Sequence, residues 1–262
     1  MAMGIKELEF TNENIEQLTE LRLDMLRTGV VHPKDVLDVC LLYRRLACGR
    51  LLAQYDAEGF FQHLYLAADS YLQLLERRHL WPDMDLYYLA RSRAEPLLDA
   101  LAIGNADLVR RIDERAEKKW HDALEYPEDH GFFSLLPMLA SAATTRTELF
   151  DGLDHMERVL EGAEYPRFEV LKALVQGDSA AFEKGLLAAL EAYQSRMDRQ
   201  RKSGMANPLA LATDANVFVE GIAFVRLARA RGLRTRSQYP LIPPITLSAP
   251  QPGSRQRPIW NG

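Results

Sequence analysis

The adjacent residues His121 and Asp122 are the first place in this chain where residue types suggest chemistry. A histidine–aspartate pair holds metal in one class of helical phosphohydrolases, where a second histidine and aspartate complete the site. His63 and Asp154 would have to supply those ligands here. Because such a site needs side chains that converge from separate helices, and the sequence shows no sign of convergence, we predict no metal site. We interpret His121-Asp122 as a solvated helix end and keep a metal-dependent helical hydrolase as an alternative.

Acidic residues gather in two neighbouring stretches. One is the loop in WHDALEYPEDHG (residues 120–131), and the other is the segment 147–161, where side chains three or four positions apart share a helix face. Such carboxylates can act as general acid and base, bind a basic partner, or face solvent. Their pattern predicts exposure, whereas reactive pairs need a pocket that shifts their pKa values. The candidate binding residues are Glu125, Glu128, Asp129, Asp151, Asp154, Glu157 and Glu161.

Motifs that mark the common enzyme classes are missing from the sequence. It contains no HExxH zinc motif, no GxSxG nucleophile elbow and no GxxxxGK[ST] phosphate loop. Trp81, Tyr87 and Tyr88 could stack on bases or anchor an interface, but their helical spacing beside Leu86 and Leu89 is more typical of a core. We therefore predict a protein that is not an enzyme, with no catalytic residue and no cofactor.

Charge is unevenly distributed along the chain. The net charge is -5, yet seven arginines and no acid or lysine follow from Arg226 onward, which leaves -12 on residues 1–225. An acidic body repels phosphate and so disfavours nucleic acid as a direct partner, while it favours a basic protein. The alternative is that the acidity serves only solubility.

Cysteine usage and the N-terminal sequence favour the cytoplasm. Cys40 and Cys48 are separated by roughly 12 Å of helical rise, too far for a disulfide, and both lie among apolar residues. The start MAMGIKELEF lacks the basic and apolar regions of a signal peptide. Since no apolar run approaches the roughly 18 residues that span a bilayer, we expect no membrane association.

Helical periodicity dominates the chain and predicts an all-α fold. Apolar residues recur at i, i+3, i+4 and i+7, and alternating runs rich in valine, isoleucine and threonine are missing. About ten helices are expected, over 12–28, 34–55, 59–80, 83–103, 105–124, 131–144, 147–161, 167–176, 178–201 and 208–231.

Two segments share one pattern. LDALAIGNADLVRRI (98–112) and LKALVQGDSAAFEKGLL (171–187) each join an Ala-Leu helix to a second helix through Gly-Asn or Gly-Asp. Glycine ends the first helix in a left-handed turn, and the following residue caps the second. Repeated hairpins predict a stacked, solenoid-like or pseudo-duplicated array. We assign 1–237 to one helical domain, or to two halves at about 1–125 and 126–237.

Residues 238–262 form a different kind of segment. They hold six of the thirteen prolines, which exclude helix, so we predict an extended Pro/Arg tail whose Leu241–Ile245 portion packs on the body. From about residue 248 onward we expect mobility.

The order of these segments resembles a known family. The chain is similar to the all-helical polymorphic-toxin immunity proteins, and most closely to immunity family 49. The similarity is carried by the Gly-Asn hairpin, the acidic loop and apolar helix in EYPEDHGFFSLLPMLA, the hairpin LKALVQGDSAAFEKGLLAAL, and the closing LARARGL and YPLIPP. The resemblance covers roughly residues 60–244 and rests on order and spacing. It implies a cytoplasmic protein that binds and neutralises a secreted antibacterial toxin, often a nuclease delivered by type VI secretion.

No catalytic residue comes with this resemblance. We expect the toxin to contact the loop 125–129 and the acidic face of 151–161. A second copy of the same chain, in a homodimer, is a further partner that the sequence leaves open. The rival interpretation is a helical-repeat scaffold or regulator that has no toxin partner.

Overall fold

The computed structural model describes residues 4–29, 31–80, 85–204 and 207–248. Within these ranges the regular structure is helical, and the β-type pairing is confined to one isolated bridge between Tyr239 and Ile242. The all-α prediction is confirmed. The α-helices are α1 (Ile5–Thr28), α2 (Pro33–Gln54), α3 (Ala57–Arg77), α4 (Pro96–Ala102), α5 (Ala106–Arg115), α6 (Pro127–Ala140), α7 (Arg146–Leu160), α8 (Pro166–Gln176), α9 (Ser179–Ser203), α10 (Pro208–Ala212), α11 (Val219–Ala230) and α12 (Ile245–Ser248). Short 3-10 helices are η1 (Arg78–Leu80), η2 (Leu86–Leu89), η3 (Arg91–Arg93) and η4 (Asp214–Asn216).

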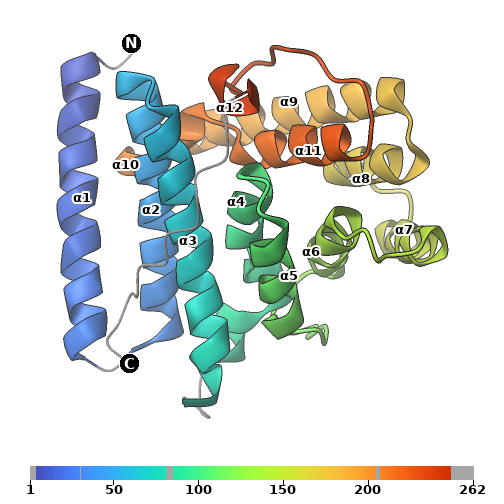
Figure 1. The fold of residues 1–262 in the computed structure, drawn as a ribbon, viewed down its shortest axis with the longest axis horizontal. Coiled ribbons are helices and arrows are strands. Elements are labelled where there is room, and N and C mark those ends of the chain that lie inside the picture. Colours follow the sequence, from blue (N-terminus) through green and yellow to red (C-terminus); the bar gives the residue numbers. More distant parts are fainter. Residues whose placement is uncertain (1–3, 30, 81–84, 205–206, 249–262) are drawn as a thin grey trace.

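The helices form an array with α1 at one end and α7 at the other (Figure 1). α2 packs against both α1 and α3, α8 packs against α9, and α11 packs against α4. One apolar cluster extends from Leu23 in α1 to Leu247 in α12. This shared core joins helices on both sides of residue 125, while the assignment of domain boundaries stays a prediction.

Both glycine hairpin turns form as predicted. Gly104 and Gly177 adopt left-handed conformations, with φ of 69° and 73°. The Asn105 side chain accepts a hydrogen bond from the Leu108 backbone N–H, and the Asp178 side chain accepts from two backbone N–H groups at the start of α9. These turns hold α4 against α5 and α8 against α9.

The predicted helix over 83–103 is wrong apart from its last third. Only α4 is α-helical there, and the preceding chain forms η2 and η3. Two features accompany the difference: the buried guanidinium of Arg91 reaches Asp113 on α5, and Pro96, which is tolerated at the first turn of a helix but not in its interior, stands at the start of α4. Residues 81–84, including Trp81, lie outside the described residues.

Two further predicted helices end early or break. The one over 105–124 stops at Arg115, where Ala116 turns extended and the Glu117 carboxylate accepts hydrogen bonds from the Lys118 and Lys119 backbone N–H groups. The one over 208–231 is split between α10 and α11, because Thr213 leaves helical geometry with φ -121° and ψ -95°. The first helix, by contrast, starts earlier than predicted, at Ile5.

The described part of the tail packs on the body as predicted, because Ile242 is buried. Tyr239 is buried as well. Contrary to the prediction of a purely extended segment, Ile245–Ser248 forms a short helix, α12. Residues 249–262 lie outside the described residues, so the predicted mobile end stays a prediction.

Several arginines of the basic C-terminal region bind backbone carbonyls. Arg231 donates to the carbonyls of Leu139 and Leu174, at the ends of α6 and α8, over 3.2 and 3.1 Å. Arg226 and Arg229 donate to carbonyls of Thr246 and Leu247 in α12. Cations suit helix C-termini, where carbonyls lack helical partners, so these side chains stabilise the fold.

One segment, Pro208–Ala230, is long and apolar enough to span a bilayer, which our prediction of no such run missed. Its most apolar stretch is 67% buried within the fold. The break between α10 and α11 interrupts it as a helix. Burial and interruption are typical of a core segment.

Candidate functional site

Three adjoining cavities form a polar cleft bordered by α2 and α4 on one side and by α8, α9 and α11 on the other. Their volumes are about 590, 370 and 340 Å³. Arg167 and Arg196 line all three, so the cavities adjoin at these two side chains. We call this groove the central cleft.

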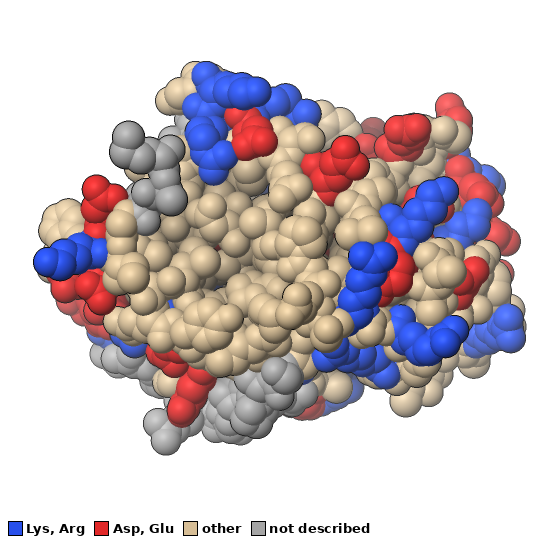
Figure 2. All heavy atoms as spheres, turned by 90° about the horizontal axis from the view of Figure 1, so that it is seen from above, with Lys and Arg blue, Asp and Glu red and all other residues tan. Residues whose placement is uncertain are grey.

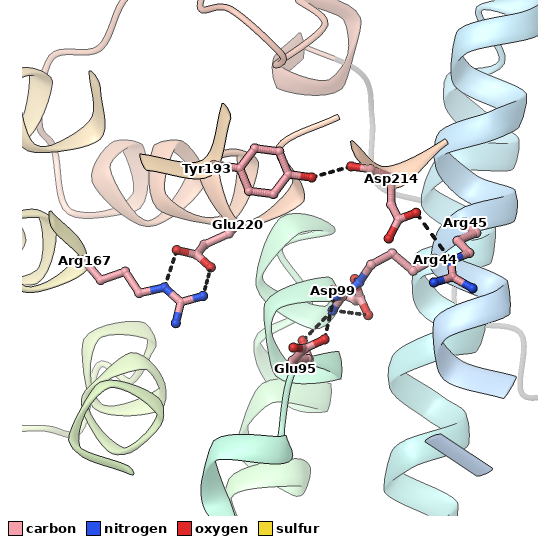
Figure 3. Close-up of polar contacts among 8 residues, drawn as sticks. All are labelled: Arg44, Arg45, Glu95, Asp99, Arg167, Tyr193, Asp214 and Glu220. Atoms are coloured by element: carbon pink, nitrogen blue, oxygen red, sulfur yellow. Dashed lines mark hydrogen bonds and ion pairs between the residues drawn. The ribbon is translucent and has the colours of Figure 1, made fainter. Parts of the chain in front are cut away.

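An ion pair between α2 and α4 lies beside the central cleft, which its arginine, Arg44, lines (Figure 3). The Arg44 guanidinium donates from Nε to Asp99 Oδ1 over 2.7 Å and from Nη2 to Asp99 Oδ2 over 3.0 Å. Arg44 also binds the carboxylate and the carbonyl of Glu95. Burial raises the pKa of Asp99 to about 6, and the Arg44 charge limits that rise. Paired in this way, Asp99 can remain ionised at neutral pH inside the fold.

A second ion pair joins α8 to α11 on the opposite side of the cleft (Figure 3). Arg167 binds both carboxylate oxygens of Glu220, over 2.8 and 2.5 Å. Its guanidinium also lies 4.6 Å from the centre of the Phe132 ring on α6. Burial opposes the charge of Arg167, but Glu220 outweighs that effect and raises the arginine pKa. Three helices are therefore held at one guanidinium.

The break between α10 and α11 contributes a third contact to the cleft. Asp214 lies 3.4 Å from Arg45 on α2, and its carbonyl accepts a hydrogen bond from the Tyr193 hydroxyl on α9. Burial raises the pKa values of Asp214 and Tyr193. The non-helical course at Thr213 thus presents an acid to α2 that a continuous helix would have placed elsewhere.

Glu125, a predicted contact residue, is buried rather than exposed. Only 8% of it is accessible, and its Oε2 accepts the Ser92 backbone N–H over 2.8 Å. The Trp120 indole donates to the Glu125 carbonyl. The loop after α5 is therefore fastened to η3 through this glutamate, which periodicity could not reveal.

The other two acids of the loop are half-buried at the start of α6. Asp129 accepts a hydrogen bond from the Tyr165 hydroxyl over 2.9 Å and lies 3.5 Å from Arg167. Glu128 stands in the same first turn, where its negative charge interacts favourably with the dipole at the helix N-terminus. Asp129 and Glu125 both line the largest cavity of the central cleft, and Glu128 does not.

The four predicted acids of the second stretch lie exposed on α7 and outside the central cleft. Glu157 pairs with Lys172 over 3.1 Å, and Glu161 ends the helix in a left-handed conformation. Asp151 and Asp154 have no side-chain hydrogen bond or ion pair within the described part of the chain. We call Asp151, Asp154, Glu157 and Glu161 the α7 acidic face.

The residues of the hydrolase alternative do not come together. His63 is held on α3, where its Nδ1 lies 2.6 Å from the Gly59 carbonyl oxygen and its ring packs beside Tyr43. His121 and Asp122 stand in the loop after α5, not at a helix end as predicted, and Asp154 lies exposed on α7. In the described ranges, no group of three or more histidine, cysteine, aspartate or glutamate side chains is arranged to hold a metal.

Sequence reasoning missed the acids of the two ion pairs at the cleft, although a signal for them exists. Asp99 stands inside the apolar run LLDALA, and Glu220 stands inside VFVEGIAFV. A charged residue on the apolar face of a helix has to find a partner, because an unpaired buried charge is costly. The prediction for Tyr87 was wrong for another reason. It was predicted to lie in the core, but it is 38% exposed and lines the largest cavity.

One face of the molecule has an uncharged centre. Figure 2 shows charged side chains of both signs around the margin of this face, with lysine and arginine side chains next to aspartate and glutamate side chains.

Comparison with known proteins places the chain in a family. The family model described as Immunity protein 49 matches residues 14–245. Searches of curated proteins and of solved structures returned no significant match. The matched range runs from within α1 to the first residue of α12 and includes every residue of the central cleft named above. The chain therefore belongs to the Immunity protein 49 family.

Proposed function

We propose that this protein protects the cell that makes it by binding a secreted antibacterial toxin in the cytoplasm. Family membership, over residues 14–245, is the observation that carries the proposal, since it supports an immunity role. Inhibition by binding requires no catalytic group on the immunity protein. The partner we propose is a basic nuclease-type toxin delivered by type VI secretion, because a basic protein complements the acidic residues 1–225.

The α7 acidic face and the neighbouring loop are the contact surface that we propose. Asp151 and Asp154 are exposed and uncommitted, which leaves them available to lysine or arginine side chains of a toxin. Charges at the rim of an interface mainly speed association and select partners, whereas a few buried anchors supply most of the affinity. Such interfaces bury on the order of 1,600 Å² in total.

Co-expression with the product of the neighbouring gene tests this function. We expect a stable 1:1 or 2:2 complex on size exclusion, and survival of cells that express both proteins; a 2:2 complex would also reveal the proposed homodimer. If the two proteins elute separately and the cells die, the immunity function is wrong and a helical scaffold without a toxin partner takes its place.

A further inference from the structure

The largest cavity of the central cleft has a distinctive chemical lining. It has a volume of about 590 Å³ and lies where the loop after α5 meets η3 and the start of α6. Four carboxylates, three arginines and two tyrosines contribute to its wall. These charged and aromatic residues are Tyr87, Arg93, Glu95, Asp122, Glu125, Tyr126, Asp129, Arg167 and Arg196.

Each arginine of this cavity already lies against a partner within the protein. Arg93 lies over the Tyr87 ring at 4.3 Å and binds its hydroxyl, and Arg196 lies 5.3 Å from the centre of the Tyr193 ring. Arg167 is held by the two oxygens of Glu220. An incoming anion would have to compete with these contacts.

Two of the carboxylates, by contrast, have unused capacity. Glu125 is more than nine-tenths buried, and its Oε1 has no hydrogen-bond donor among the described residues, while Oε2 accepts from Ser92. Asp122 is exposed on the cavity wall and has no side-chain partner in the same part of the chain. Ionised carboxylates accept several hydrogen bonds, and a buried oxygen without a donor is unfavourable.

An exposed aromatic ring completes the wall. Tyr126 precedes α6 and is 71% exposed, and the face of a tyrosine ring attracts cations. Carboxylates with spare acceptor capacity beside an open ring suit a lysine ammonium or an arginine guanidinium. Neither the α7 acidic face nor the other cavities of the cleft combine a buried unsatisfied acid with such a ring.

We infer that this cavity receives one lysine or arginine side chain of the toxin as the anchor of the complex. The inference rests on the proposed function and deepens it by naming the anchoring chemistry: a cation between Asp122 and Glu125, beside Tyr126. The α7 acidic face then acts at the rim, while the cavity supplies a desolvated contact of the kind that dominates binding energy.

The test measures the affinity of the purified toxin for Glu125→Gln, Asp122→Asn and Tyr126→Ala by titration calorimetry. Glu125→Gln keeps an oxygen for the Ser92 N–H while it removes the charge. Glu125→Gln and Asp122→Asn should each bind at least about tenfold more weakly, because removing one member of a charge pair in an interface is costly. Tyr126→Ala should also weaken binding, because it removes the ring face that attracts the cation. Glu13→Gln is the matched control, since Glu13 is exposed on α1 at the opposite end of the array from α6 and α7.

The outcomes separate the inference from the function on which it rests. If the wild type binds while Glu125→Gln and Asp122→Asn, folded by circular dichroism, bind as tightly as wild type, the cavity is not the anchor. If the wild type itself fails to bind, the proposed function fails and the inference with it.

Double-mutant cycles identify the class of side chain directly. The lysines and arginines of the toxin are replaced singly by alanine and combined with Asp122→Asn. One toxin residue should lose affinity non-additively with Asp122→Asn. Additive losses at every basic toxin residue would overturn the assignment of a cationic anchor.

Discussion

The guanidinium of Arg44 and the carboxylate of Asp99, 55 residues apart in the chain, form a two-point ion pair between α2 and α4. Asp99 is fully buried, and 13% of the Arg44 side chain is accessible. A pair this deep offers little net gain over apolar residues, but removing one member leaves a charge without its partner. Its contribution is therefore to fix how these two helices pack.

Replacing Asp99 by alanine should lower the free energy of unfolding by about 3 kcal/mol, the usual cost of breaking a buried pair. Urea denaturation followed by circular dichroism measures the change. Asp107→Ala is the control, because Asp107 pairs with Arg110 on the exposed surface of α5. Equal stability of Asp99→Ala and the control would contradict a structural role for the buried pair.

Arg231→Met should destabilise the fold by about 2 kcal/mol, since charged donors to helix-end carbonyls are stronger than neutral ones. The substitution removes the hydrogen bonds to the carbonyls of Leu139 and Leu174 and retains an apolar stem. Arg234→Met serves as the comparison, because the exposed Arg234 forms no such contact within the described residues. Thermal unfolding of both variants checks the prediction, and similar melting temperatures for the two would count against it.

Stability should fall as pH drops below about 6.5, in part through His63. Burial lowers the pKa of His63 in the folded state below its ordinary value. The unfolded chain then binds more protons in this window, so acidification favours unfolding. His130 contributes with the same sign, and Asp99, with its raised pKa of about 6, contributes with the opposite sign.

The His63→Asn variant isolates the contribution of His63, because asparagine can still donate to the Gly59 carbonyl. Unfolding free energies of wild type and variant are compared between pH 5 and pH 7.5. We expect a shallower loss of stability on acidification in His63→Asn. Parallel pH profiles would show that His63 does not titrate differently on folding.

Charge reversal on the proposed toxin surface should weaken protection. Asp154→Lys combined with Glu128→Lys should slow association with the toxin about tenfold at low salt, with less effect as salt rises. Asp129 is left intact because it holds Tyr165 and Arg167. Stopped-flow or biosensor kinetics give the rates, with Glu13→Lys as control, and an unchanged association rate would place the toxin elsewhere.

Local signals in the sequence were sufficient for most helices and for both glycine hairpins. Gly104-Asn105 and Gly177-Asp178 carry their turn chemistry within a few residues, so the sequence alone specifies them. The errors have a different origin. The break before α11 is accompanied by a contact between Asp214 and Arg45, 169 residues away, and periodicity contains no trace of such a contact.

The candidate site was partly accessible to prediction. The sequence pointed to the acidic loop and to α7, and the exposed acids are found on α7. It could not separate Glu125, which is buried against Ser92, from Asp154, which faces solvent, because both occur in acidic stretches. That difference depends on how the loop after α5 folds back onto η3, a tertiary arrangement.

Two sets of residues at the central cleft have different roles. Ion pairs between helices stand beside the cleft, whereas the Asp122 and Tyr126 side chains, on the wall of its largest cavity, form no ion pair within the described residues. In the binding mode that we propose, substitutions at these two positions alter which partner is recognised while the ion pairs of the scaffold stay unchanged. A lineage of such proteins can follow a changing toxin by varying a few loop side chains, at little risk to folding.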